Sequence, residues 1–150
     1  MIVKGLVLNA PLEMTPVEER VFELSKCLEV GIITDDGVYR IRLEKGFQSN
    51  LRSGSNILDC IIPHCGNQMV AVAYLVHDMF YSCDENGEHL ASKEIADKLL
   101  EAMLVYAGVS KVKAKLVKKS VQWFGNTAWN EYDTLCKRNQ GLYSFRWDAK

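Results

Sequence analysis

The pattern of polar and apolar residues over about residues 1–50 is mixed and strand-like. The stretch "IVKGLVL" is rich in β-branched residues, and "VYRIRLEKGF" alternates Arg40 and Arg42 with apolar neighbours. The turn-forming residues "TDDG" precede the second stretch. Residues 30–47 are therefore predicted to form a β-hairpin with Asp36-Gly37 at its tip.

Residues 16–28 are compatible with two structures. Thr15, Pro16 and Glu18 resemble the start of a helix. Four apolar residues then fall on one helical face, namely Val17, Val21, Leu24 and Leu28. The segment "VFELSKCLEV" is equally able to lead into the hairpin as a strand, so both alternatives stay open.

The apolar pattern changes to the period of an α-helix from Gln68 onward. A first helix is predicted over residues 68–81, where the polar stretch "CDENGEH" ends it. Ser92 is the expected cap of a second helix, which Gly108 ends. Ser110 begins a third helix. Its inward-facing residues are expected to be Val112, Leu116, Val117, Val121 and Phe124.

The tail at residues 132–150 carries three aromatic residues at strand alternation, so we expect it to pack back on the domain or to pair with a sheet edge. Together the elements predict an α+β fold in a single domain covering residues 1–150. An N-terminal antiparallel β-hairpin or small sheet, over about residues 1–50, would pack with a C-terminal three-helix segment over about residues 68–131. A hydrophobic fraction of 48% is sufficient for one core.

Charge and hydropathy narrow the classes of function. The chain has 18 Lys and Arg against 19 Asp and Glu, which leaves a net charge of -1 and no strong signal for nucleic-acid binding. The longest apolar stretch, residues 69–76, is too short to cross a bilayer, and the start "MIVKGLVLNA" lacks the order of a signal peptide. A soluble, cytoplasmic chain without a transmembrane segment is therefore expected.

Five lysines lie on the third predicted helix: Lys111, Lys113, Lys115, Lys118 and Lys119. The simpler interpretation is the solvated part of an amphipathic helix. The alternative is a surface that binds an anionic membrane or nucleic acid.

The five cysteines are scattered and odd in number, which argues against a secreted disulfide framework and predicts reduced thiols. Cys60, His64 and Cys65 share one loop, and Cys83 follows His77 by six residues. These residues are candidates for a zinc site, but their spacing matches none of the paired Cys-x-x-Cys forms. Buried structural thiols are the alternative.

The main candidate for chemistry is a pair of ionisable residues inside the apolar run "AYLVHDMFY". His77 falls on one helical stripe between Tyr74 and Tyr81, and Asp78 points about one hundred degrees away. A buried imidazole needs a partner for its second nitrogen, which Asp97 on an antiparallel second helix would supply. His77 backed by Asp97 is a general-base arrangement, with Asp78 free to bind a cation. The alternative is a structural tie between two helices.

Three stretches, "VHDMFY", "SKEIADKLLEAMLVYAGV" and "KSVQWFGNTAW", resemble a family of phage and prophage proteins catalogued as domain of unknown function thirteen fifty-three. The likeness lies in a His-Asp-x-x-Tyr helix, an Ala-Asp second helix and a Phe-Gly…Ala-Trp third helix, over roughly residues 38–129. It departs at "SNLRSGSNILDCIIPHC", where the family usually shows a Thr-Asp…Ala-Ser-Ile-Pro stretch. The resemblance implies a phage or prophage origin, a location in the host cytoplasm or the virion, and other phage or host proteins as partners. It implies no settled activity.

The His-Asp-x-x-Tyr and Ala-Asp motifs also resemble the catalytic core of phospholipase A-two, including the viral capsid form. The likeness implies that His77 activates water while Asp97 orients His77. It further implies that Asp78 holds calcium and that Tyr81 belongs to the same catalytic group. Calcium needs several oxygen ligands, and the only counterpart of the Gly-rich calcium loop is "SGSN" at Ser53–Asn56. The disulfides of the secretory members are absent.

Two functions from different classes follow. The first is a hydrolase of an ester or a lipid with His77 as its base. The second is a non-catalytic phage component, such as a virion, tail or host-interaction protein, in which the His-Asp pair only organises helices. A buried, sealed His77 would favour the second function, and an open cleft with oxygen ligands around Asp78 would favour the first.

Overall fold

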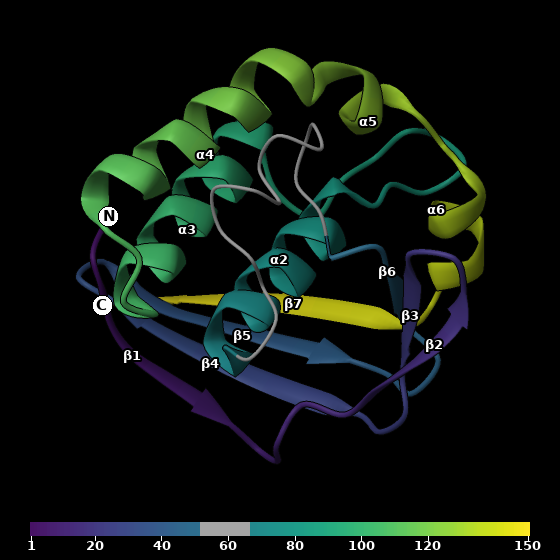
Figure 1. Cartoon of the computed structure of the whole chain (residues 1–150), viewed down its shortest axis with the longest axis horizontal. Helices are drawn as coiled ribbons and strands as arrows, with labels where there is room; N and C mark the ends of the chain where they lie inside the picture. The colour runs from purple at the N-terminus through teal and green to yellow at the C-terminus, as the bar shows by residue number, and fades with distance from the viewer. Residues whose placement is uncertain (52–66) are drawn as a thin grey trace.

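The computed structural model describes residues 1–51 and 67–150, in which N-terminal antiparallel sheets are followed by packed helices and a C-terminal strand (Figure 1). This is the α+β fold that the sequence predicts. The strands are β1 (Val3–Leu8), β2 (Met14–Glu18), β3 (Val21–Leu24), β4 (Leu28–Thr34), β5 (Gly37–Leu43), β6 (Gln48–Ser49) and β7 (Tyr143–Ala149). The helices are α2 (Gln68–Tyr81), α3 (Lys93–Tyr106), α4 (Lys111–Phe124), α5 (Asn126–Asn130) and α6 (Thr134–Asn139).

A four-stranded antiparallel sheet with the order β1-β4-β5-β7 forms the base of the fold. Its centre is the predicted hairpin, in which Leu28 pairs with Leu43 and Ile33 pairs with Val38. At the tip, the hydroxyl of Thr34 accepts a hydrogen bond from the Gly37 amide at 3.2 Å. The hairpin prediction is therefore confirmed.

The alternative structures for residues 16–28 are decided in favour of strands. β2 and β3 form a hairpin of their own, and β6 adds a third strand to make a second sheet with the order β2-β3-β6. Arg20 lies in the turn with a φ of 62°, a left-handed backbone conformation. Strand pairing here outweighs the local helix-start signal, because propensity is weaker than tertiary context.

The C-terminal tail completes the first sheet. β7 pairs with β5 along its length, so that Tyr143 lies opposite Leu43 and Trp147 lies opposite Tyr39. The expected pairing of the tail with a sheet edge is confirmed, although α5 and α6, which precede β7, are short helices that the sequence analysis did not predict.

The helices are layered over one face of the four-stranded sheet, with α4 outermost (Figure 1). Ten of the fourteen residues of α2 are buried, and Phe80 meets Phe145 of β7 with ring centroids 5.2 Å apart. The predicted caps are present: the hydroxyl of Ser92 accepts from the Ile95 amide, and that of Ser110 accepts from the Lys113 amide.

The predicted inward face of the third helix is partly wrong. Val117 and Val121 are buried together with Ala114, but Val112, Leu116 and Phe124 are exposed. The reason is that α4 packs on α3 and lies far from the sheet. Only a narrow stripe of its side chains is therefore covered. Within the described residues, no helix is long and apolar enough to cross a membrane.

Candidate functional site

Helices α2 and α3 are antiparallel, and a histidine and an aspartate join them. Asn67 before α2 donates to the carbonyl of Ala107 after α3, while residues near the other ends meet at His77 and Asp97. The Nε2 atom of His77 lies 2.9 Å from Oδ1 of Asp97, and the side chains are 2% and 1% exposed. The contact expected from the sequence is therefore present.

Asp97 accepts hydrogen bonds from two further side chains. The Tyr81 hydroxyl donates to the same Oδ1 atom at 2.8 Å, and the Lys93 ammonium donates to Oδ2 at 2.7 Å. Lys93 also donates to the carbonyl of Val121 at 3.0 Å. A buried carboxylate needs such donors, because an unpaired charge away from water is costly.

The surroundings fix the protonation of the pair. Burial lowers the pKa of His77 below its usual 6.5, although the hydrogen bond to Asp97 acts in the opposite direction. Burial alone would raise the pKa of Asp97, but hydrogen bonds led by that from His77 outweigh it and hold the pKa below 3.8. A neutral imidazole therefore faces an ionised carboxylate near pH 7. Nε2 then carries the ring proton and donates a hydrogen bond to Asp97.

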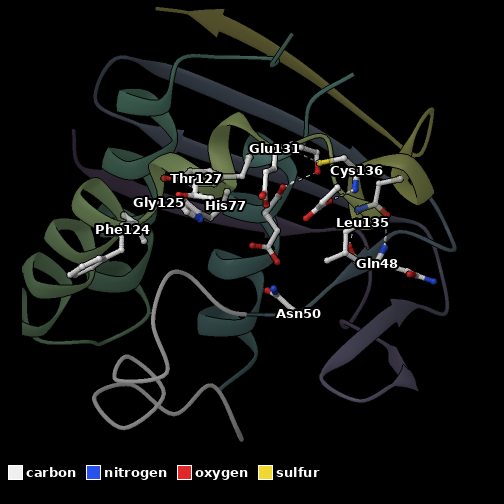
Figure 2. A pocket seen from close by; sticks show the side chains of 16 residues that line it. Gln48, Asn50, His77, Phe124, Gly125, Thr127, Glu131, Leu135 and Cys136 are labelled. Carbon is white, nitrogen blue, oxygen red and sulfur yellow. Dashed lines mark hydrogen bonds between the residues drawn. The ribbon is translucent and has the colours of Figure 1, made fainter. Parts of the chain in front are cut away.

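A pocket of about 590 Å³ lies beside this pair. Its lining comes from α2, from the end of α4, from the segment around β6 and from the short helices α5 and α6. Figure 2 shows its lining side chains, with Phe124 and Gln48 at opposite ends of the view and Asn50 at its lower edge. His77, Asp78 and Tyr81 all contribute to the wall. The sequence-predicted site residues on α2 therefore share one cavity.

Asp78 is partly buried on the wall of the same pocket. The hydroxyl of Ser49 donates a hydrogen bond to its Oδ2 atom, so the carboxylate is engaged rather than free as the sequence analysis expected. Burial raises the pKa of Asp78 to about 7, opposed by the hydrogen bond from Ser49 and reinforced by the nearby charge of Asp133. Asp78 is thus protonated more readily than an ordinary aspartate.

Gly125, which caps the end of α4, lies close to Tyr81. A Cβ atom at this position would clash with the backbone carbonyl of Val121, and it would lie 2.7 Å from the Tyr81 hydroxyl and 3.3 Å from its ring. The ring of Tyr81 also contacts that of Trp129, with centroids 5.0 Å apart in a T-shaped arrangement. The absence of a side chain at Gly125 therefore leaves room for the Tyr81 hydroxyl beside Asp97.

Three contributors to the site were not among the predicted site residues: Lys93, Ser49 and Gly125. The i,i+4 spacing of Lys93 and Asp97 on one helix is a signal that points to the first. Gly125 belongs to the Phe-Gly stretch noted in the sequence, but its contact with Tyr81 arises only through tertiary packing, and so does the contact of Ser49 with Asp78.

Only part of the predicted zinc and calcium sites lies within the described residues. Among them, no group of three or more His, Cys, Asp or Glu side chains is arranged to hold a metal ion. The thiol of Cys83 instead donates to the carbonyl of Glu131 at 3.5 Å, as does that of Cys136 at 3.6 Å. Cys60, His64, Cys65 and the "SGSN" segment at Ser53–Asn56 lie outside the described residues.

Calcium does not fit the described residues by themselves. Asp78 brings one carboxylate, which already accepts from Ser49, whereas calcium takes six to eight oxygen ligands.

Comparison with known proteins identifies the family. The chain belongs to the family described as protein of unknown function DUF1353, whose model matches residues 28–121. This range includes the His-Asp-x-x-Tyr motif and Asp97, but it begins earlier and ends earlier than the 38–129 expected from the motifs. No curated protein and no solved structure gives a significant match.

Proposed function

We propose that this chain is a hydrolase of esters or lipids in which His77 is the general base. The observation that carries the proposal is the position of His77, paired with the buried Asp97, on the wall of a pocket of about 590 Å³. A histidine in a cavity, held in one tautomer by an ionised carboxylate, is the arrangement that proton abstraction from water requires.

In the proposed reaction, the neutral imidazole of His77 takes a proton from water while the water oxygen bonds to the ester carbonyl carbon. The tetrahedral intermediate then collapses: the bond from carbon to the leaving oxygen breaks, and the imidazolium returns the proton to that oxygen. Asp97 stabilises the imidazolium between these steps, and Tyr81 and Lys93 hold Asp97 in place.

The likeness to the phospholipase A-two core supports the lipid branch of this proposal. In both, a histidine on one helix is backed by an aspartate on the next. Asp78 would be the calcium ligand in that scheme, and we keep this role as a proposal because the ligands expected from Ser53–Asn56 lie outside the described residues. Adding calcium is therefore one arm of the experiment.

The burial of the His77–Asp97 pair favours a second candidate function. His77 is only 3% exposed, and a tie between two helices would be buried in the same way. On this alternative the chain is a non-catalytic virion, tail or host-interaction component. The origin proposed for either function is phage or prophage, with the host cytoplasm or the virion as the location. Phage genes on both sides of the coding gene would support that origin, and housekeeping genes on both sides would contradict it.

The experiment compares the wild type with His77→Asn on a panel of small esters and phospholipids, with and without calcium. His89→Asn is the matched control, because His89 stacks on Trp129 but does not line the pocket. We expect the wild type and His89→Asn to release acid from at least one substrate, and His77→Asn to lose about a hundred-fold to ten-thousand-fold in rate. A wild type that cleaves nothing on the panel would favour the non-catalytic component.

A further inference from the structure

Helix α4 presents an apolar stripe to solvent. Its inner side is Ala114, Val117 and Val121, which are buried. Its exposed apolar residues, with their exposed fractions, are Val112 at 72%, Leu116 at 48%, Trp123 at 72% and Phe124 at 66%. The spacing of four and then seven residues places Val112, Leu116 and Trp123 on one side of the helix. Single exposed apolar residues are ordinary, but a stripe of them marks a contact surface.

Positive charge accompanies this stripe. Lys111, Lys113, Lys115 and Lys119 are exposed, and α4 contains no Asp or Glu. Of the five α4 lysines, Lys118 alone has an ion-pair partner within the described residues, namely Glu101 at 3.3 Å. The chain as a whole has a net charge of -1, so this helix is a local concentration of cations.

The two features together identify the chemistry of the partner. Nucleic acid would match the lysines but would leave the aliphatic side chains Val112 and Leu116 against polar phosphate and sugar. An anionic bilayer matches both, because aliphatic side chains enter the acyl boundary while lysines meet the headgroups. Tryptophan also prefers the membrane interface. We propose that the outer face of α4 binds peripherally to anionic lipid bilayers, with the helix lying in the plane of the surface.

The geometry places the candidate site beside this surface. α4 is the outermost helix, on the side of the molecule away from the four-stranded sheet (Figure 1). Phe124 belongs both to the exposed face and to the pocket, where it lies at one end (Figure 2). A bilayer bound to α4 would therefore adjoin the cavity of His77. The use of bilayer lipid as substrate rests on the proposed function, whereas the binding itself does not.

The test is co-sedimentation of the full chain with vesicles of phosphatidylcholine, with or without phosphatidylglycerol. We expect binding only to the vesicles that contain phosphatidylglycerol, weakened by salt. Replacing both Lys115 and Lys119 with Gln should weaken binding about thirty-fold, from about 1 kcal/mol for each lysine. Leu116→Ser should weaken it about tenfold or more. Lys45→Gln, in the turn after β5, and Val7→Ser, on β1, are exposed positions away from α4, and as matched controls they should bind as the wild type does.

Tryptophan fluorescence separates insertion from simple charge attraction. We expect a blue shift on adding phosphatidylglycerol vesicles, which Trp123→Phe removes while sedimentation persists. Absence of binding, equal binding by the α4 variants and the controls, or binding to RNA or DNA in place of vesicles would overturn the inference. His77→Asn should bind vesicles like the wild type. Vesicle binding by a wild type that cleaves no substrate would therefore reject the hydrolase and retain the membrane surface.

Discussion

The carboxylate of Asp97 is 1% exposed, and a buried charge of this kind destabilises a fold unless hydrogen-bond donors surround it. Its two oxygens accept from three side chains, His77, Tyr81 and Lys93. The arrangement satisfies the charge and selects the tautomer of His77. The same three contacts therefore serve stability and the proposed chemistry at once.

Gly125→Ala should disturb this arrangement through Val121 and Tyr81. The new Cβ atom would clash with the backbone carbonyl of Val121, which accepts from Lys93, and would lie 2.7 Å from the Tyr81 hydroxyl, so the end of α4 and the Tyr81 ring must shift. We expect a loss of about 1–3 kcal/mol in the free energy of unfolding, typical of overpacking at a buried position. Denaturant unfolding measures it, with Gln122→Ala on the exposed side of α4 as the control. Equal stability of Gly125→Ala and the wild type would show that both groups have room to move.

Asp78→Asn should change the pH dependence of stability. The pKa of Asp78 is about 7 in the fold and 3.8 as the ordinary value, so the folded state holds a proton that the unfolded chain has lost between about pH 4 and pH 7. Stability from this group therefore falls as pH rises through that window. The uncharged amide of Asn removes the effect and can still accept from Ser49.

The measurement for Asp78→Asn is its stability relative to the wild type at either end of the window. As pH rises from about 4 to about 7, we expect the free energy of unfolding of the variant to increase relative to that of the wild type. Above about pH 7 the difference should stay constant. The titration of His77 is common to both proteins and largely cancels in the difference. A difference that is constant with pH would show that Asp78 titrates like an exposed aspartate.

At the scale of elements, Lys93 connects three helices. It lies in the first turn of α3, binds Asp97 of that helix, which in turn holds His77 of α2, and donates to the carbonyl of Val121 in α4. That carbonyl is in the last turn of α4, where it also accepts from the backbone amide of Gly125 at 2.9 Å. One ammonium group thus joins the ends of helices that border the pocket.

Lys93→Met should weaken this junction and raise the pKa of His77. The ammonium charge lowers the pKa of His77 and stabilises the ionised Asp97, and removing one partner of a buried ion pair leaves the other uncompensated. Because Lys93 is 19% exposed, we expect a loss of about 1–3 kcal/mol in the free energy of unfolding. Proton NMR titration of His77 checks the direction of the pKa change.

Lys98→Met is the control for Lys93→Met on the same helix. Lys98 pairs with Glu94 at 2.6 Å, but both side chains are exposed, so its loss should change stability by less than about 1 kcal/mol and leave the pKa of His77 unaltered. Equal effects of the two variants would mean that the Lys93 contact with Asp97 has no special role.

At the scale of the whole molecule, the pocket collects residues from distant parts of the chain, from Gln48 to Asn139. The sequence predicted the parts whose signals are local. The turn-forming stretch "TDDG" placed the hairpin tip at Asp36-Gly37, Ser92 and Ser110 placed two helix starts, and strand alternation indicated β7. The His77–Asp97 contact was also predictable, because both residues face inward on consecutive helices.

The parts that the sequence did not predict depend on tertiary packing. Residues 16–28 carry helix and strand signals together, and the pairing of β2 with β3 and of β3 with β6 decides between them. Val112, Leu116 and Phe124 have the periodicity of a buried face, yet α4 is covered on its inner side alone. Ser49 reaches Asp78 from a two-residue strand, for which no periodic pattern exists.

The central claim is that His77 takes a proton in this pocket rather than only tying two helices together. The most direct measurement is the pH profile of hydrolysis by the wild type and by His77→Asn on one ester or lipid substrate, with thermal unfolding of both. We predict that wild-type activity rises with pH to a plateau, with an apparent pKa below 6.5, because burial lowers the pKa of His77. His77→Asn should stay folded, lose the rise of activity with pH and hydrolyse the substrate about a hundred-fold more slowly, or slower still. A wild type without hydrolysis, or a His77→Asn variant that keeps the rate and the pH profile, would contradict the account.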